Sequence, residues 1–370
     1  MSLTEVFCQD RAIDILQRAH AVGRSAHAYI FAGGEGVGKF KTAGEWTKML
    51  LCGNPVIKDD FSDSCGSCES CRLFEAESHP DYHRVYKELR QFTEKGKGKP
   101  PPIDLPIDVI REFLVEKVSA RPAFSPRRVF VISEAEKLND ASQNALLKVL
   151  EEPPGYCHIF LICTRMDRLL PTTKSRCQII RFGLVSEERI IEKLIETGAE
   201  QKQGQYWARL CRGSMGVACQ LARLELSGGN LYASKKEVVS RVAALKYADA
   251  LQLAQWFLDK GKKISGVWGE IEEATSKSDV NRRALKTLVQ MIVSALHDAM
   301  RLNLDPTGEI INFDQKGQIE VLMGRYDAEQ AAERIAMCYR ADRQIESSVN
   351  EKLIFEQLLL SLGSSDILRD

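Results

Sequence analysis

Short apolar segments alternate with amphipathic ones through the first half of the chain. The apolar segments are rich in β-branched and aromatic residues, and they cover 28–32, 83–86, 129–132, 159–162 and 178–180. Such runs are typical of buried strands. Between them, apolar side chains recur three or four residues apart, as at Ile110, Phe113 and Leu114 and again at Ala145, Leu146 and Val149, which predicts helices with one apolar face. Strands that alternate with helices indicate a parallel sheet covered by helices.

The strand pattern ends after Phe182, and the rest of the chain predicts helices. Residues 186–224 predict short helices, and residues 243–362 keep a helical period to their strongly apolar end. A chain of 370 residues is long enough for two or three domains, because domains commonly hold ~100–200 residues. We therefore predict an α/β domain at 1–183, a small helical domain at 184–235 and an all-helical domain at 236–370.

Composition and charge exclude several classes of protein. Hydrophobic residues make up 44% and charged residues 28%, as in ordinary globular proteins. No apolar run approaches the ~20 residues that span a bilayer, and the first residues lack a signal-peptide pattern, so we expect a cytoplasmic protein without membrane contact.

Because 51 basic residues balance 51 acidic ones, any contact with nucleic acid must be local. The basic segment 94–102 is expected to be a solvated insertion, with phosphate contact as the alternative.

Four of the eleven cysteines lie close together in the sequence, at Cys52, Cys65, Cys68 and Cys71. Clustered cysteines in a reducing compartment favour a metal site over disulfides, and four thiolates can complete a tetrahedral Zn²⁺ site. Since no ligand position would remain open, we expect the zinc to be structural. The alternative is a group of reduced, buried cysteines, but a C-x₂-C-x₂-C segment among polar residues does not resemble a core.

A glycine-rich loop follows the first predicted strand and precedes a predicted helix at 41–51. It reads GGEGVGKF, with Gly33, Gly36, Gly38 and Lys39 at the spacing of a P-loop. In such loops backbone N–H groups and the helix N-terminus face phosphates, and the lysine adds a positive charge. The sequence therefore predicts a site for the phosphates of ATP or ADP.

Two positions that normally hold the magnesium ion are altered. Phe40 stands where Ser or Thr would supply a hydroxyl ligand, and Ser133 stands where the strand at 129–132 would be followed by a metal-binding Asp. Glu134 comes next but does not replace the missing ligands. We predict that any bound nucleotide is held without productive magnesium chemistry.

Several motifs in a fixed order make the chain similar to a known family. Besides the P-loop and the cysteines, the motifs are SAHAY at 25–29, HPD at 79–81, IDVIRE at 107–112, NALLKVLEEPP at 144–154 and SRC at 175–177. Together they resemble the clamp-loader family of bacterial DNA polymerase III, a branch of the AAA+ proteins. The resemblance is close over 7–181 and looser beyond.

Within that family, the chain resembles the delta-prime stator more than the ATP-hydrolysing gamma/tau motor. Phe40 and Ser133 favour the stator, and so does Gly216, since motor subunits place a nucleotide-sensing arginine there. The chain also lacks the long extension of tau-type subunits after its apolar helix, although short gamma forms would look the same. The gamma/tau motor stays the alternative.

The resemblance implies a RecA-like AAA+ domain, a helical lid and a helical collar within a five-membered ring. That ring would contain gamma/tau motors and a delta subunit, and it would place a sliding clamp on primed DNA. Arg176 would be an arginine finger for a neighbour's ATP site, and Thr164 lies near the family's sensor position. A free-standing zinc protein that binds nucleic acid is a weaker hypothesis, because no aromatic residues are interleaved with basic ones.

Overall fold

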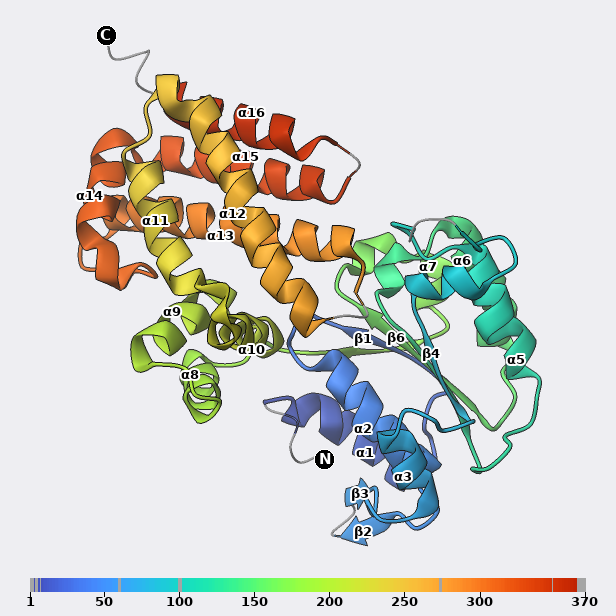
Figure 1. The fold of residues 1–370 in the computed structure, drawn as a ribbon. Helices are drawn as coiled ribbons and strands as arrows, with labels where there is room; N and C mark the ends of the chain where they lie inside the picture. Colours follow the sequence, from blue (N-terminus) through green and yellow to red (C-terminus); the bar gives the residue numbers. More distant parts are fainter. Residues whose placement is uncertain are drawn as a thin grey trace. The chain divides into compact units, whose positions relative to one another are not determined.

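The computed structural model describes Leu3, Val6 and residues 8–58, 61–98, 102–272, 275–347 and 349–364. It divides into two compact units, Met1–Ser186 with Ser214–Gly216 and Glu187–Gly213 with Val217–Asp370 (Figure 1). The first unit holds the sheet, and the second is helical. The predicted lid and collar both fall largely in the second unit, so their boundary stays a prediction.

The first unit is built on a five-stranded parallel sheet. Its strands are ordered β4 (Tyr82–Val85), β5 (Arg128–Ile132), β6 (Cys157–Cys163), β1 (Ala28–Ala32) and β7 (Gln178–Arg181). The three central strands β5, β6 and β1 are buried along their whole length. This is expected when helices cover both faces of a sheet, and it confirms the parallel sheet predicted from the sequence.

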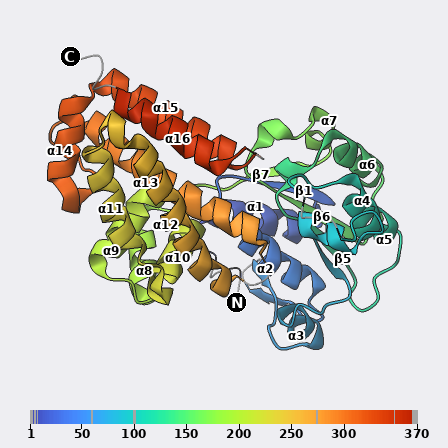
Figure 2. The same ribbon diagram turned by 45° about the horizontal axis from the view of Figure 1, so that its top comes forward.

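Two apolar cores lie on opposite faces of this sheet, because alternate strand residues point to opposite sides. Tyr29 and Phe31 pack with Trp46 on the face covered by α1 (Asp10–Ala21) and α2 (Lys39–Leu51). Ile30 instead points to the opposite face. The helices that cover this face are α4 (Ile107–Ile110), η3 (Arg111–Val115), α5 (Glu116–Val118) and α6 (Asp140–Glu151) (Figure 2).

Shorter elements connect these layers. The antiparallel pair β2 (Val56–Lys58) and β3 (Phe61–Asp63) and the helix α3 (Glu69–Glu75) follow α2. The remaining short helices of this unit are η2 (Lys87–Phe92), η4 (Ala135–Lys137), η5 (Met166–Arg168) and α7 (Pro171–Lys174). Part of the basic segment 94–102 falls outside the described residues.

The second unit is all-helical where it is described, as the sequence predicts. Its longer helices are α8 (Glu187–Glu196), α9 (Gln201–Cys211), α10 (Met215–Leu224), α11 (Leu231–Ala243), α12 (Ala250–Ile271), α13 (Lys277–Leu304), α14 (Lys316–Arg325), α15 (Ala328–Ile345) and α16 (Glu351–Gly363). The long helix α13 packs against α11, α12, α14 and α15. The apolar run near the C-terminus forms α16, whose Phe355 stacks on Phe257 of α12. Among the described residues, no helix is both long and apolar enough to cross a bilayer.

Candidate functional site

The four clustered cysteines converge on one point. Cys52 directly follows α2, Cys65 follows β3, Cys68 caps the N-terminus of α3, and Cys71 lies in the first turn of that helix. Their Sγ atoms all lie within 4.8 Å of one another, and four of the separations are 3.5, 3.6, 3.8 and 4.0 Å. Four sulfurs around one tetrahedral zinc ion, each ~2.3 Å from the metal, would lie ~3.8 Å apart. The arrangement can therefore hold one metal ion.

Backbone N–H groups point at the sulfurs, as they do in metal–thiolate sites. Cys65 donates to Cys52 Sγ at 3.4 Å, Cys68 donates to Cys65 Sγ at 3.3 Å, and Cys71 donates to Cys68 Sγ at 3.4 Å. The backbone N–H groups of Ser67 and Cys68 lower the pKa of Cys65 to about 6. The left-handed backbone of Gly66 at φ 70° makes the tight turn possible. These donors favour a thiolate at Cys65, whereas burial raises the pKa of the Cys52 and Cys71 thiols.

The glycine-rich loop lies between β1 and α2, where the sequence predicts it. Gly36 and Gly38 have positive φ angles of 69° and 104°, a conformation that favours glycine. The ammonium group of Lys39 donates to the carbonyl oxygens of Gly33, at 2.8 Å, and of Gly34. Burial lowers the pKa of Lys39. The lysine of the loop is therefore bound to the loop itself.

The two altered magnesium positions are brought together by a third residue, Arg84 of β4. Its guanidinium carbon lies 4.5 Å from the centre of the Phe40 ring, and its Nε donates to Ser133 Oγ at 3.4 Å. A fixed positive charge thus bridges the side chains that stand where the ion's ligands are expected. No sequence motif connects Arg84 with this site. The available signal was its place near the carboxyl end of a strand beside the one that leads to Ser133.

The two acidic side chains that follow β5 have partners within this domain. Glu134 forms an ion pair with Lys137 at 2.5 Å. Glu136 accepts hydrogen bonds from the hydroxyl of Thr164 and, at 3.1 Å, from its backbone N–H. No motif in the sequence assigns Glu136 to this site. Its carboxylate engages the hydroxyl of Thr164, the residue near the family's sensor position.

Gly216 contacts the P-loop through its backbone. Its N–H donates to the Gly36 carbonyl at 2.7 Å, and the Ser214 hydroxyl donates to the Glu35 carbonyl at 2.7 Å. A Cβ at position 216 would lie 2.9 Å from Gly36 Cα, which is too close for any other residue without a shift. The position expected to carry a nucleotide-sensing arginine in motors thus requires the absence of a side chain.

Arg176 lies in the short connection between α7 and β7. It forms an ion pair with Glu151, at the end of α6, at 2.5 Å, and it donates to the Thr172 carbonyl at 2.9 Å. One third of its side chain is exposed. The single chain thus shows a surface ion pair, and the predicted contact with a neighbour's ATP site stays a prediction.

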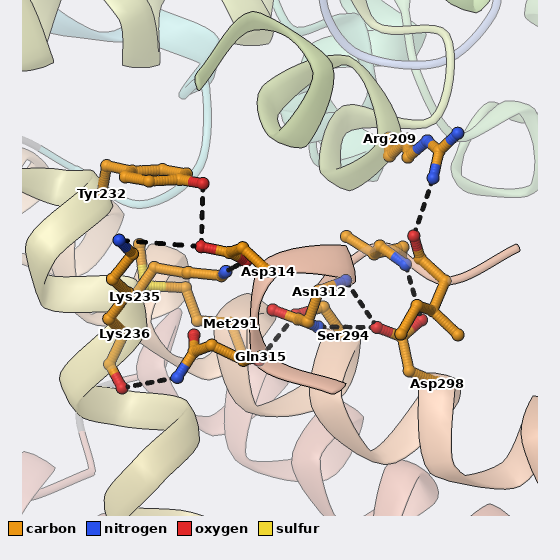
Figure 3. Close-up of polar contacts among 12 residues, drawn as sticks. Arg209, Tyr232, Lys235, Lys236, Met291, Ser294, Asp298, Asn312, Asp314 and Gln315 are labelled. Atoms are coloured by element: carbon orange, nitrogen blue, oxygen red, sulfur yellow. Dashed lines mark hydrogen bonds and ion pairs between the residues drawn. The ribbon is translucent and has the colours of Figure 1, made fainter. Parts of the chain in front are cut away.

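A buried polar network in the helical unit ties the segment 310–315 to two helices (Figure 3). Lys235 of α11 is fully buried and pairs with Asp314, which also accepts from the Tyr232 hydroxyl at 2.8 Å. Asp298 of α13 accepts from the backbone N–H groups of Ile311 and Asn312 at 2.9 and 2.7 Å. Burial raises the pKa of Asp298. The network satisfies backbone groups and has the character of a structural junction.

Comparison with known proteins identifies the relatives of this chain. Family models described as DNA polymerase III, delta subunit, and as its C-terminal part match residues 8–186 and 278–363. A DNA polymerase III subunit delta' of Pseudomonas aeruginosa is 38% identical over 41% of this chain, but the match spans only 42% of that relative. The subunit delta' of Buchnera aphidicola is 26% identical and aligns over 93% of this chain and 92% of its own length. A subunit tau of Salmonella typhimurium is 27% identical over 82% of this chain and 44% of its own length.

Proposed function

Since the chain belongs to the DNA polymerase III delta-prime subunit family, we propose that it is the stator of a clamp loader. In this role it joins gamma/tau motor subunits and a delta subunit in a five-membered ring that places the sliding clamp on primer-template DNA. The stator itself hydrolyses no ATP. It contributes a rigid scaffold and one arginine to a neighbouring ATP site.

The contact of Arg84 with Phe40 and Ser133 carries this proposal. Phosphoryl transfer in P-loop enzymes depends on a magnesium ion that neutralises charge developing on the phosphates. Here the positions of two ion ligands lack their usual oxygens, and a guanidinium lies between them. A divalent cation would be repelled by that charge at close range. Phosphates of ATP or ADP could still contact the loop at Gly33, Gly36, Gly38 and Lys39. The magnesium ion that hydrolysis requires would have no binding site.

Arg176 is the residue that we assign to a neighbour's ATP site. Its only ionic partner among the described residues is Glu151, and the two side chains are 33% and 47% exposed. A solvent-exposed ion pair contributes at most ~1 kcal/mol. Arg176 could therefore leave Glu151 and bind a phosphate at little cost. An arginine finger contributes ~10³–10⁵ in rate.

The cysteine cluster is proposed to hold one structural Zn²⁺. The separations of Cys52, Cys65, Cys68 and Cys71 fit a single tetrahedral ion. Bound metal would fix the chain between α2 and α3, which otherwise consists of short elements. Because the protein fills all four coordination positions, the metal would have no open position for substrate.

The alternative is a gamma/tau-like motor, which the similarity to tau and the presence of Lys39 favour. Purified chain incubated with Mg-ATP separates the two functions. We expect no turnover above background from the chain alone. The same chain, mixed with the tau-type and delta subunits of its organism, should be required for clamp-dependent ATP hydrolysis and clamp loading. Steady turnover by the isolated chain, abolished in Lys39→Ala, would establish the motor instead.

A further inference from the structure

The His79-Pro80-Asp81 motif lies beside the cysteine cluster in space. The Ser70 and Ser125 hydroxyls both donate to the carbonyl oxygen of Leu51, at 2.6 and 2.9 Å. The Nε2 atom of His79 lies 3.0 Å from Ser70 Oγ and 3.1 Å from Ser125 Oγ. The three polar side chains are at most 8% exposed. Leu51 directly precedes Cys52 and Ser70 directly precedes Cys71, so the motif contacts the backbone next to two of the four sulfurs.

The hydrogen bonds around His79 define one protonation state. Its Nδ1 accepts from the backbone N–H of Asp81 at 3.1 Å, so Nδ1 carries no proton. The hydroxyl protons of both serines are directed to Leu51, which leaves their oxygens as acceptors for the Nε2 proton. A neutral imidazole with its proton on Nε2 satisfies every group. Buried polar groups are costly when they lack partners, so this small network fixes the geometry of its members.

Asp81 anchors the same motif to the sheet. Its carboxylate accepts from the backbone N–H groups of Ala123, Phe124 and Ser125 at 2.7 to 2.8 Å. The guanidinium of Arg128, the first residue of β5, lies 3.3 Å away and pairs with it. Asp81 thereby holds the segment that carries Ser125, and Ser125 in turn contacts His79 and Leu51.

From this geometry we propose that His79 is a positioning residue for the metal site. It holds Leu51 and Ser70, and through them Cys52 and Cys71, at the separation that a tetrahedral ion needs. This role rests on the proposed four-thiolate site and adds to it a mechanical connection with the edge of the sheet. Groups behind metal ligands commonly change metal affinity 10–100-fold when they are replaced.

An ordinary core histidine would stabilise the fold without affecting metal affinity, and His158 provides that comparison within the chain. His158 is 5% exposed, similar to His79 at 4%. Its Nδ1 lies 3.2 Å from the carbonyl oxygen of Ala26, and among the described residues it forms no hydrogen bond with the cysteine cluster or with the backbone next to it. The two histidines thus have similar burial but different neighbours.

The test is titration of the apo protein with Co²⁺, whose thiolate and ligand-field absorption bands report tetrahedral sulfur coordination. We expect His79→Leu to weaken Co²⁺ affinity about 10–100-fold and to change the ligand-field band. His79→Gln, which can place an amide N–H near the position of Nε2, should restore most of the affinity.

His158→Leu should lower thermal stability and leave Co²⁺ affinity unchanged. Ser125→Ala removes one contact with a smaller change in volume and should weaken affinity several-fold even where His79→Leu does not fold.

Two results would overturn the role of His79. One is wild-type Co²⁺ affinity in both His79→Leu and Ser125→Ala, and the other is an equal loss of affinity in His158→Leu. If the wild-type chain itself gives no tetrahedral thiolate spectrum, the metal site is wrong and the role of His79 falls with it. None of these three results bears on whether the chain acts in a clamp loader.

Discussion

The guanidinium carbon of Arg84 lies 4.5 Å from the centre of the Phe40 ring. A cation over an aromatic face is attracted by ~0.5–1 kcal/mol at an exposed site. Phe40 therefore does more than remove a hydroxyl, because its ring helps to hold a permanent positive charge beside Ser133. In the proposed stator, the missing magnesium ligands and the fixed cation would both disfavour a bound divalent ion.

Restoring the two magnesium ligands alone should fail to restore metal binding. In Phe40→Thr/Ser133→Asp, Arg84 remains and can pair with the new carboxylate, so we expect nucleotide binding to stay insensitive to magnesium. Addition of Arg84→Ala should make nucleotide binding stronger with magnesium than with EDTA. Calorimetric titration of the three proteins measures this. Magnesium-dependent binding by the double variant would show that Arg84 does not exclude the ion.

Replacement of Arg176 should slow ATP hydrolysis by the assembled ring while this chain still folds and assembles. Lysine does not reproduce the forked donors of a guanidinium, so Arg176→Lys should be nearly as damaging as Arg176→Ala. The loss of turnover should be partial, since in the proposed ring this arginine serves one of several ATP sites. DNA- and clamp-stimulated turnover of the reconstituted ring is the measurement.

Glu151→Gln is the matched control for Arg176. It removes the ion-pair partner and leaves the guanidinium in place, so ring activity should be at least that of wild type. If Arg176→Lys and Arg176→Ala leave turnover and clamp loading unchanged in confirmed rings, Arg176 is only a surface ion-pair residue.

Removal of metal should unfold the cysteine segment locally and leave the sheet folded. We expect one zinc per wild-type chain after dialysis and much less in Cys68→Ser, which lacks one of four ligands. Cys8→Ser, at an exposed cysteine outside the cluster, should retain zinc. Metal analysis together with proteolysis of the 52–71 segment reports both effects. Full zinc content in Cys68→Ser would contradict the four-thiolate assignment.

Asp81→Asn should lower stability most at neutral pH. Burial alone would raise the pKa of Asp81, but its hydrogen bonds from Ser125, Ala123 and Phe124 and from Arg128 outweigh burial and lower it. A lowered pKa means that the carboxylate stabilises the fold above its unfolded-state pKa of ~3.9, and that this contribution is lost as pH falls through the folded-state pKa.

We therefore expect Asp81→Asn to cost ~1–3 kcal/mol at pH 7, and the difference from wild type to shrink below about pH 4. Denaturant unfolding at both pH values measures it. Asp104→Asn, at an exposed position, should cause little change at either pH. A difference between wild type and Asp81→Asn that is independent of pH would show that the charge of Asp81 is not what matters.

In the helical unit, removal of one partner of the buried pair should cost more than removal of both. Lys235→Met removes the buried cation and leaves Asp314 only the exposed Lys236, 3.8 Å away. Breaking a buried pair commonly costs ~3–5 kcal/mol. Lys235→Met/Asp314→Leu removes both charges and should recover part of that loss. Thermal unfolding of the three proteins tests the order, and a double variant less stable than the single one would contradict it.

The local features of this protein can be predicted from its sequence. Continuous apolar runs predict the strands because these strands are buried on both faces. Apolar side chains three or four residues apart predict helices that bury one face. The spacing of Cys52, Cys65, Cys68 and Cys71 and that of Gly33 and Lys39 likewise describe short segments, and both clusters form where they were expected. Phe40 and Ser133 could be recognised because each departs from a local motif.

Contacts between distant segments depend on the three-dimensional fold. Arg84 and Ser133 are 49 residues apart and become neighbours because β4 and β5 pair in parallel with a fixed register. The contacts of Glu136 with Thr164 and of His79 with Ser125 also join different elements. No periodicity encodes such pairs, since they depend on strand order and on the buried side chains that set the distance between elements. For the same reason, the HPD motif contributes to the family resemblance, but the sequence does not reveal that His79 contacts the segments beside the cysteines.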